Sequence, residues 1–237
     1  NTAIVEAGDF RANVEFASKS GLSKLTAPVF ARVESSESAA EATLYDGKTE
    51  RQTGAITDLI AAIGTLDLEN PIISLNKNYT STLATTSTFT LDLNGYDLNG
   101  LTVNGGELTL AYSKYGGNIN STVKVEDGKL ILNGATLVDG VTVASGAILE
   151  QNGATINAAS IAIENNGTTI INEGVIEGTS TAGVKSTGAL TINGGLVKGN
   201  YALWVAGGTA DVKKGTLNGS SYGIYSDAST TTEKLAT

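Results

Sequence analysis

The sequence predicts an all-β fold, a single-stranded right-handed parallel β-helix that winds through about seven coils between residues 91 and 225. Three observations lead to this prediction. A glycine follows an apolar strand at intervals of about 19 to 21 residues, a second apolar strand follows each glycine, and Asn-Gly pairs recur between strands. The anchoring glycines are Gly134, Gly153, Gly174, Gly195 and Gly215.

The second strand of each unit is read as a triplet whose first and third members face inward, because strand residues alternate sides. The first members are Val141, Ile161, Ala182, Leu203 and Tyr222, and the third members are Val143, Ile163, Val184, Val205 and Ile224. Both columns are apolar, so stacked coils would build a core that no single coil could bury alone. The middle members, expected to point outward, are Thr142, Ala162, Gly183, Trp204 and Gly223.

The Asn-Gly pairs have a second interpretation, since this dipeptide is also the common turn of a β-hairpin. A hairpin joins antiparallel neighbours after two residues. The apolar columns here align at about 20 residues instead, which favours a coil that returns to its own parallel neighbour.

Composition restricts the partners. The chain has 237 residues, a net charge of −9 and neither cysteine nor histidine. An acidic protein lacks the basic face that nucleic acid requires, and it is repelled by anionic membranes. No apolar run approaches the 18 residues of a membrane span, and no disulfide can form. Asn1 and the absence of methionine indicate a processed or trimmed product.

Four segments are expected along the chain. Residues 1–41 lack the repeat and are interpreted as an N-terminal arm, 42–70 as a linker with a capping helix, 71–227 as the β-helix and 228–237 as a polar tail. Apolar residues at helical spacing predict the helix over Ile56–Ile63, with Thr53 as N-cap and Gly64 at its end. Its apolar face would cover the open end of the first coil.

The start of the repeat, Thr88-Phe89-Thr90-Leu91-Asp92-Leu93-Asn94-Gly95 preceded by this helix, resembles right-handed parallel β-helix domains of pectin-lyase-like fold. Such domains occur in bacterial cell-surface proteins and in phage fibres and tailspikes. The resemblance covers residues 42–226 and implies an extracellular, cell-surface or virion location. Polysaccharide lyases and hydrolases share the fold, so the resemblance leaves open whether the chain is an enzyme.

No catalytic constellation is evident. An enzyme on this fold would need two or three acids at equal phase in adjacent coils, and the acids here are scattered. Glu150 and Glu173 come nearest, but they are 23 residues apart, more than one period. We therefore expect no catalytic residue, no metal site and no cofactor.

The aromatic residues offer a better candidate site. Trp204 is the one tryptophan, at an outward position, and Tyr201 and Tyr225 are expected near it on this coil and the next. Such rings could contact a surface glycan or a protein partner, or simply lie under a loop.

The function expected from the sequence is a non-catalytic structural or adhesive module, such as a fibre, decoration protein or adhesin. The alternative is a β-helix that binds or degrades polysaccharide. Capsid or tail proteins could be partners through the N-terminal arm, and a homo-oligomer is also open.

Overall fold

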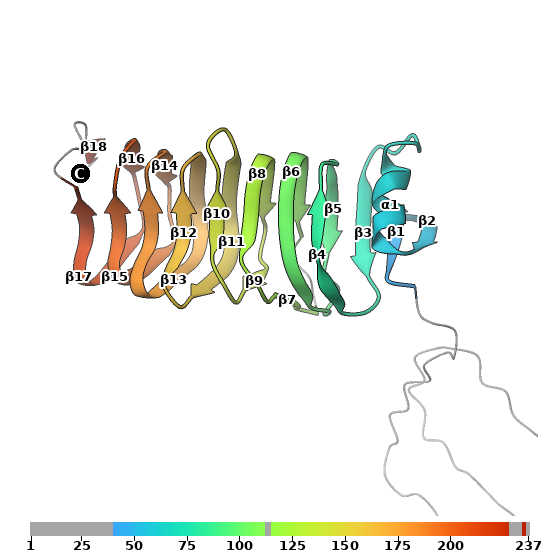
Figure 1. Ribbon diagram of the computed structural model, residues 1–237, viewed down its shortest axis with the longest axis horizontal. Coiled ribbons are helices and arrows are strands. Elements are labelled where there is room, and N and C mark those ends of the chain that lie inside the picture. Colours follow the sequence, from blue (N-terminus) through green and yellow to red (C-terminus); the bar gives the residue numbers. More distant parts are fainter. Residues whose placement is uncertain (1–39, 112–114, 228–233, 236–237) are drawn as a thin grey trace, which may run out of the picture. The chain divides into compact units, whose positions relative to one another are not determined.

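The computed structural model describes residues 40–111, 115–227 and 234–235. The predicted arm, apart from residues 40–41, and most of the polar tail lie outside the described residues. Figure 1 shows strands of successive coils side by side from β3 to β17, with α1 at the N-terminal end of this stack.

One sheet of 18 strands accounts for nearly all regular structure of the described residues. The helix is α1 (Ile56–Ile63). The strands are β1 (Ala42–Asp46), β2 (Thr49–Gly54), β3 (Pro71–Leu75), β4 (Tyr79–Thr85), β5 (Phe89–Asp92), β6 (Leu98–Leu110), β7 (Asn118–Ile119), β8 (Val123–Leu132), β9 (Thr136–Leu137), β10 (Val141–Val143), β11 (Ile148–Ala158), β12 (Ile161–Asn165), β13 (Thr168–Ser186), β14 (Ala189–Ile192), β15 (Leu196–Val205), β16 (Thr209–Val212), β17 (Thr216–Ser226) and β18 (Lys234–Leu235).

The parallel β-helix is confirmed, with about eight turns instead of about seven. From β3 onward each strand pairs in parallel with the equivalent strand one coil away, for example β13 with β11 on one side and with β15 on the other. The core is one continuous cluster of buried aliphatic side chains that runs through the stack. Among the described residues no helix is long and apolar enough to cross a membrane.

The predicted inward columns are right where Ile161 pairs with Ala182 and Ile163 with Val184, but wrong in register elsewhere. Val141 pairs with Ile163, Val184 with Leu203, and Leu203 with Ile224, because successive coils differ in length. The neighbouring inward column therefore runs from Val143 to Asn165 and Ser186, and these two polar residues are fully buried. A prediction that assumes a fixed interval of about 20 residues misses this change from apolar to polar side chains within one inward column.

Two of the predicted outward residues also lie inside. Ala162 is fully buried, and Gly183 is buried as well. The register of β13 on β15 is irregular between Gly178 and Ala182, which shows that the strand bends there. At such a corner the alternation of a flat strand is interrupted, and only a small residue fits on the inner side.

The buried polar residues satisfy one another. The side-chain amide of Asn165 donates to the Ser186 hydroxyl at 2.9 Å, and its carbonyl oxygen accepts from the Thr169 hydroxyl at 2.9 Å. All three residues have no exposed surface. A polar group inside a core is tolerated when its hydrogen bonds are made, as they are here.

The N-terminal end is closed by α1 and by a hairpin that the sequence analysis treats as linker. Strand β1 lies between β2 and β3 and is antiparallel to both. The helix has the predicted bounds and ends at Gly64, and it buries Ile56 and Leu59 completely. Its N-cap is Ala55, not Thr53; the Ile56 amide donates instead to the Glu41 carboxylate at 3.1 Å. Thr53 lies within β2, paired with β1, and is thus not placed to cap the helix.

Candidate binding surface

Four aromatic rings gather on the neighbouring strands β15 and β17, and we call Tyr201, Trp204, Tyr222 and Tyr225 the ring cluster. Strand β15 supplies Tyr201 and Trp204, and β17 supplies the other two. The parallel register sets Tyr201 beside Tyr222 and Trp204 beside Tyr225. Because identical register positions of neighbouring strands lie about 4.8 Å apart, aromatic residues at these positions are brought into contact.

The rings contact one another in two ways. Tyr201 stacks on Tyr225 with centroids 4.7 Å apart and on Tyr222 at 5.9 Å. Trp204 meets Tyr201 and Tyr225 edge to face, at 5.9 and 6.1 Å. Both geometries are the favourable ones for aromatic pairs. The structure thus brings together the three residues that the sequence analysis selected, Tyr201, Trp204 and Tyr225.

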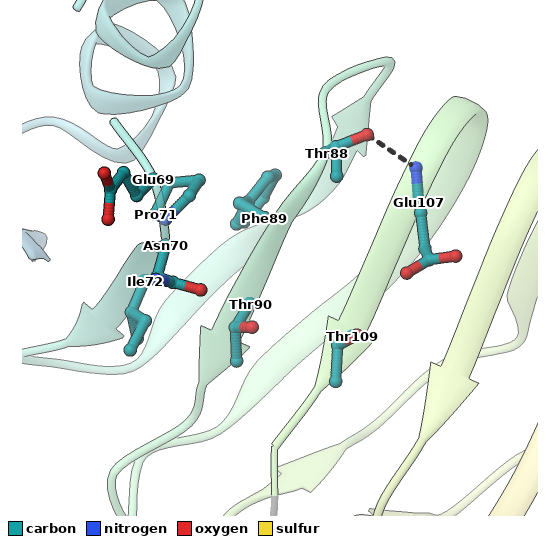
Figure 2. A pocket seen from close by; sticks show the side chains of 9 residues that line it. All are labelled: Glu69, Asn70, Pro71, Ile72, Thr88, Phe89, Thr90, Glu107 and Thr109. Atoms are coloured by element: carbon teal, nitrogen blue, oxygen red, sulfur yellow. Dashed lines mark hydrogen bonds between the residues drawn. The ribbon is translucent and has the colours of Figure 1, made fainter. Parts of the chain in front are cut away.

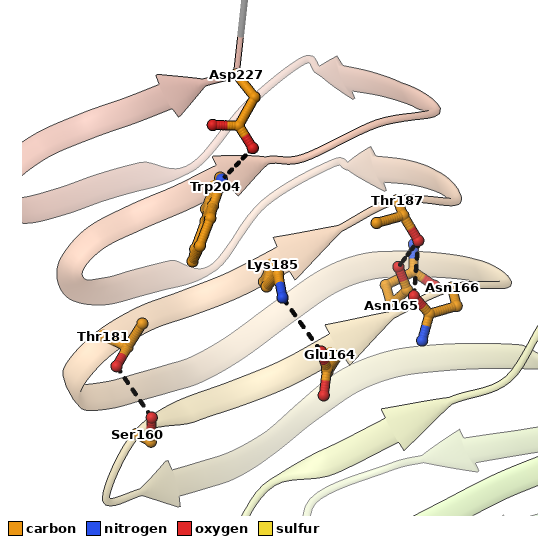
Figure 3. A network of polar contacts seen from close by, with 9 residues as sticks. All are labelled: Ser160, Glu164, Asn165, Asn166, Thr181, Lys185, Thr187, Trp204 and Asp227. Carbon is orange, nitrogen blue, oxygen red and sulfur yellow. Dashed lines mark hydrogen bonds and ion pairs between the residues drawn. The ribbon is translucent and has the colours of Figure 1, made fainter. Parts of the chain in front are cut away.

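Charged groups border the cluster along one outward column (Figure 3). The Trp204 indole Nε1 donates to a carboxylate oxygen of Asp227 at 3.2 Å. On the preceding coil the Lys185 ammonium lies 4.9 Å from the centre of the Trp204 ring and 3.4 Å from the Glu164 carboxylate. The register aligns Glu164, Lys185 and Trp204 in consecutive coils, so the bordering charges are fixed by the sheet itself.

The charge of Asp227 also acts on Tyr225. It raises the pKa of the Tyr225 phenol above its usual value, because a nearby carboxylate disfavours the phenolate. Desolvation and a hydrogen bond to Asp227 add to the same direction.

A second polar border lies beside the tyrosines. The Asn200 side-chain oxygen accepts hydrogen bonds from the hydroxyls of Ser220, at 3.2 Å, and Ser221. Asn200 immediately precedes Tyr201 in the chain and Ser221 immediately precedes Tyr222, so this hydrogen-bonded polar group lies at the bend that leads into the two strand positions that carry these rings.

Tyr222 belongs to the ring cluster but not to the predicted site. The prediction places it in the inward column, whereas the residue is 56 % exposed. The error comes from pairing it with Leu203; its true neighbour is Tyr201, 21 residues earlier. Trp204 and Tyr225 have the same separation, and this shared interval was the available signal.

A hollow of about 250 Å³ lies away from the ring cluster, beside β3, β5 and β6 (Figure 2). Glu69, Phe89, Glu107 and Thr109 are among the residues that line it. The Glu107 amide donates to the Thr88 hydroxyl at 3.0 Å, while its carboxylate faces Lys129 at 3.7 Å. Both carboxylates are exposed to solvent.

The acids considered for catalysis lie out of phase. Glu150 pairs with Ile170, whereas Glu173 pairs with Asn152, two positions further along. The Lys129 ammonium is 2.9 Å from Glu150 and lowers the pKa of that carboxyl, and Glu150 raises the pKa of Lys129 in return. A general acid needs a raised pKa, so this ion pair does not suit Glu150 for that role. Within the described ranges, no three acidic side chains are grouped to hold a metal ion.

By its fold the protein is a parallel β-helix, and it carries the ring cluster on strands β15 and β17. No family model, curated protein or solved structure matches the chain.

Proposed function

We propose that this chain is a non-catalytic structural and adhesive β-helix module, displayed on a cell surface or a virion, that contacts its partner through the ring cluster. The observation that carries the proposal is the gathering of Tyr201, Trp204, Tyr222 and Tyr225 on the outside of strands β15 and β17. Aromatic rings supply large contact area with few rotatable bonds and are enriched in recognition surfaces.

The scaffold supports such a role. Each coil buries aliphatic side chains against its neighbours, so strand positions along the outer faces are held rigidly. A site built on regular strands holds its geometry better than a site on loops. Here all four rings lie on strands β15 and β17.

The outer charges support a structural role rather than a catalytic one. Lys129 lies between Glu107 and Glu150, and Lys198 pairs with Glu177 at 2.8 Å. These pairs neutralise acids between adjacent coils and leave them poorly suited to acid-base catalysis. The net charge of −9 favours partners other than nucleic acid.

Binding and cleavage by the full chain test the proposal together. The chain is incubated with a panel of soluble polysaccharides and with intact cells, and we measure both the polymer length and the amount of protein bound. We expect unchanged polymer length and binding that Trp204→Ala weakens. Shortening of any polysaccharide would show an enzyme. Antibody labelling of intact producing cells or particles tests the location, and a wholly internal signal would contradict it.

A further inference from the structure

We propose that the ligand of the ring cluster is a neutral polysaccharide, one pyranose unit of which stacks on Tyr222. This inference rests on the proposed adhesive function and names the class of molecule that the surface accepts.

The arrangement of the rings selects Tyr222 as the stacking platform. Tyr201, Trp204 and Tyr225 are partly buried and turn their faces to one another or to Lys185. Tyr222 is 56 % exposed and stacks on Tyr201 with an angle of 28° between the ring planes. It belongs to β17, the last strand of its face among the described residues, so no ring described here stacks on it from a following coil.

The groups around the rings fit the two kinds of surface that a sugar presents. A pyranose has an apolar face of C–H groups, which packs on an aromatic ring, and a rim of hydroxyls, which donate and accept hydrogen bonds. Directly before Tyr201 and Tyr222 in their strands come the Asn200 amide and the hydroxyls of Ser220 and Ser221, which bond to one another and are exposed or partly exposed. Small-ligand sites combine an apolar wall with a few polar groups in this way.

The same surface fits a protein partner less well. Protein interfaces place their energy in a desolvated apolar centre with polar groups at the rim. Here Tyr201, Trp204 and Tyr225 are packed among themselves, and Tyr222 is the one exposed ring of the cluster. The exposed apolar surface of the cluster is thus mainly that of one ring, which matches the apolar face of one sugar unit.

The charges favour a neutral sugar over an acidic one. The one ammonium named beside the cluster, that of Lys185, is already paired with Glu164 and set over Trp204, so it is not open to an acidic ligand, and the Asp227 carboxylate adjoins Trp204. A uronic acid or a phosphorylated sugar would meet repulsion from the net charge of −9.

The one tryptophan gives a direct readout. Because Trp204 lies within the cluster, its fluorescence is titrated with dextran, mannan and galactan, and with polygalacturonate and alginate as acidic polymers. We expect a saturable change with at least one neutral polymer. Tyr222→Ala should weaken it about tenfold, or about 1.4 kcal/mol, by loss of the stacking ring. Tyr222→Phe should retain it, because the ring is kept.

Matched controls fix the interpretation. Tyr115 is 70 % exposed on an earlier coil, and Tyr115→Ala should bind like the unchanged protein. Circular dichroism verifies that each variant is folded. Binding of acidic polymers alone, equal binding by Tyr222→Ala, or no response to any polymer would overturn the inference. Polymer length is measured in the same samples: cleavage would overturn the proposed function, whereas an intact but unbound polymer would overturn only the assignment of the ligand.

Discussion

Trp204 and Asp227 are joined by a hydrogen bond of 3.2 Å from the indole Nε1 to the carboxylate, 23 residues apart in the chain. The same carboxylate acts on Tyr225, the ring that lies beside Trp204 in the next coil. One acid thus contacts Trp204 and raises the pKa of the neighbouring Tyr225 phenol.

Replacement of Asp227 should be visible in the ionisation of Tyr225. The charge of Asp227 is the largest cause of the raised phenol pKa, so Asp227→Asn should lower the pKa of Tyr225 toward its ordinary value. An ultraviolet titration, with Tyr225→Phe subtracted to isolate this tyrosine, measures the change. Asp211→Asn, on another face, is the control. A Tyr225 pKa that is unchanged in Asp227→Asn would contradict the contact.

The Lys129–Glu150 pair predicts the dependence of stability on pH. The pKa of Glu150 is held below 4.5, so its contribution is present above pH 4.5 and is lost as pH falls through the lower folded value. The pKa of Lys129 is raised above 10.5, so its contribution is present below pH 10.5 and is lost as pH rises through the higher folded value.

Glu150→Gln tests this dependence. The variant should be less stable at neutral pH by up to about 1 kcal/mol, and the difference should vanish at acid pH. Urea unfolding at several pH values measures it. Glu173→Gln, an exposed acid of the same region, is the control and should show a smaller effect. A difference that persists unchanged in acid would refute the electrostatic origin.

A corner glycine sets the position of the rings. Gly199 occupies the same register position as Gly178, directly before the bend that leads to Tyr201. A Cβ at Gly199 would lie 2.6 Å from the Tyr201 carbonyl oxygen, closer than atoms tolerate. Gly199→Ala should therefore cost about 1–3 kcal/mol in unfolding free energy and alter Trp204 fluorescence. Gly207→Ala meets only ordinary contacts and should do neither; equal effects would exclude the corner as the cause.

The sequence predicted the architecture because the apolar period and its turns recur in every coil. The helix Ile56–Ile63 was found with its end at Gly64, since three- and four-residue spacing needs no tertiary knowledge. The register between strands of adjacent coils was not predicted correctly throughout, because the number of residues differs from one coil to the next. A shift of two residues placed Leu203 opposite Ala182 and hid both the buried Asn165 and the exposed Tyr222.

The candidate site was predicted only in part, again because the register between coils could not be derived from the sequence. Trp204 was recognised as outward and Tyr225 as its neighbour, from position in adjacent coils. Asp227, Lys185 and Glu164 were not connected with it, because their contacts depend on the correct register and on side-chain direction.

Asparagines of successive coils are joined by side-chain hydrogen bonds, and this ladder should add to the stability of the fold. The side-chain amides of Asn152, Asn172 and Asn193 each donate to the oxygen of the asparagine one coil earlier, at 3.0, 2.7 and 2.8 Å, beginning at Asn133. Asn172→Ala breaks two of these bonds and should lower the free energy of unfolding by about 1–2 kcal/mol, measured in urea. The exposed Asn157 on another face is the control, and an equal loss in Asn157→Ala would mean that the ladder contributes nothing specific.

The buried group of Asn165, Thr169 and Ser186 gives the largest expected effect. Asn165→Ala would remove the acceptor of the Thr169 hydroxyl and the donor to the Ala189 carbonyl, and it would leave the Ser186 hydroxyl only its 3.4 Å bond to the Gly188 carbonyl. An unsatisfied buried polar group costs about 1–3 kcal/mol, and the lost side chain also leaves a cavity.

The triple variant Asn165→Val, Thr169→Val, Ser186→Ala separates these causes. It removes both partners of each hydrogen bond between these three side chains, so it should recover part of the stability lost in Asn165→Ala. The recovery is partial because the Ala189 and Gly188 carbonyls still lose the donors that Asn165 and Ser186 supply. Urea unfolding compares the two. A triple variant that is less stable than Asn165→Ala would contradict this expectation. It would mean that the hydrogen bonds among these side chains stabilise the native protein by more than the burial of their polar groups costs.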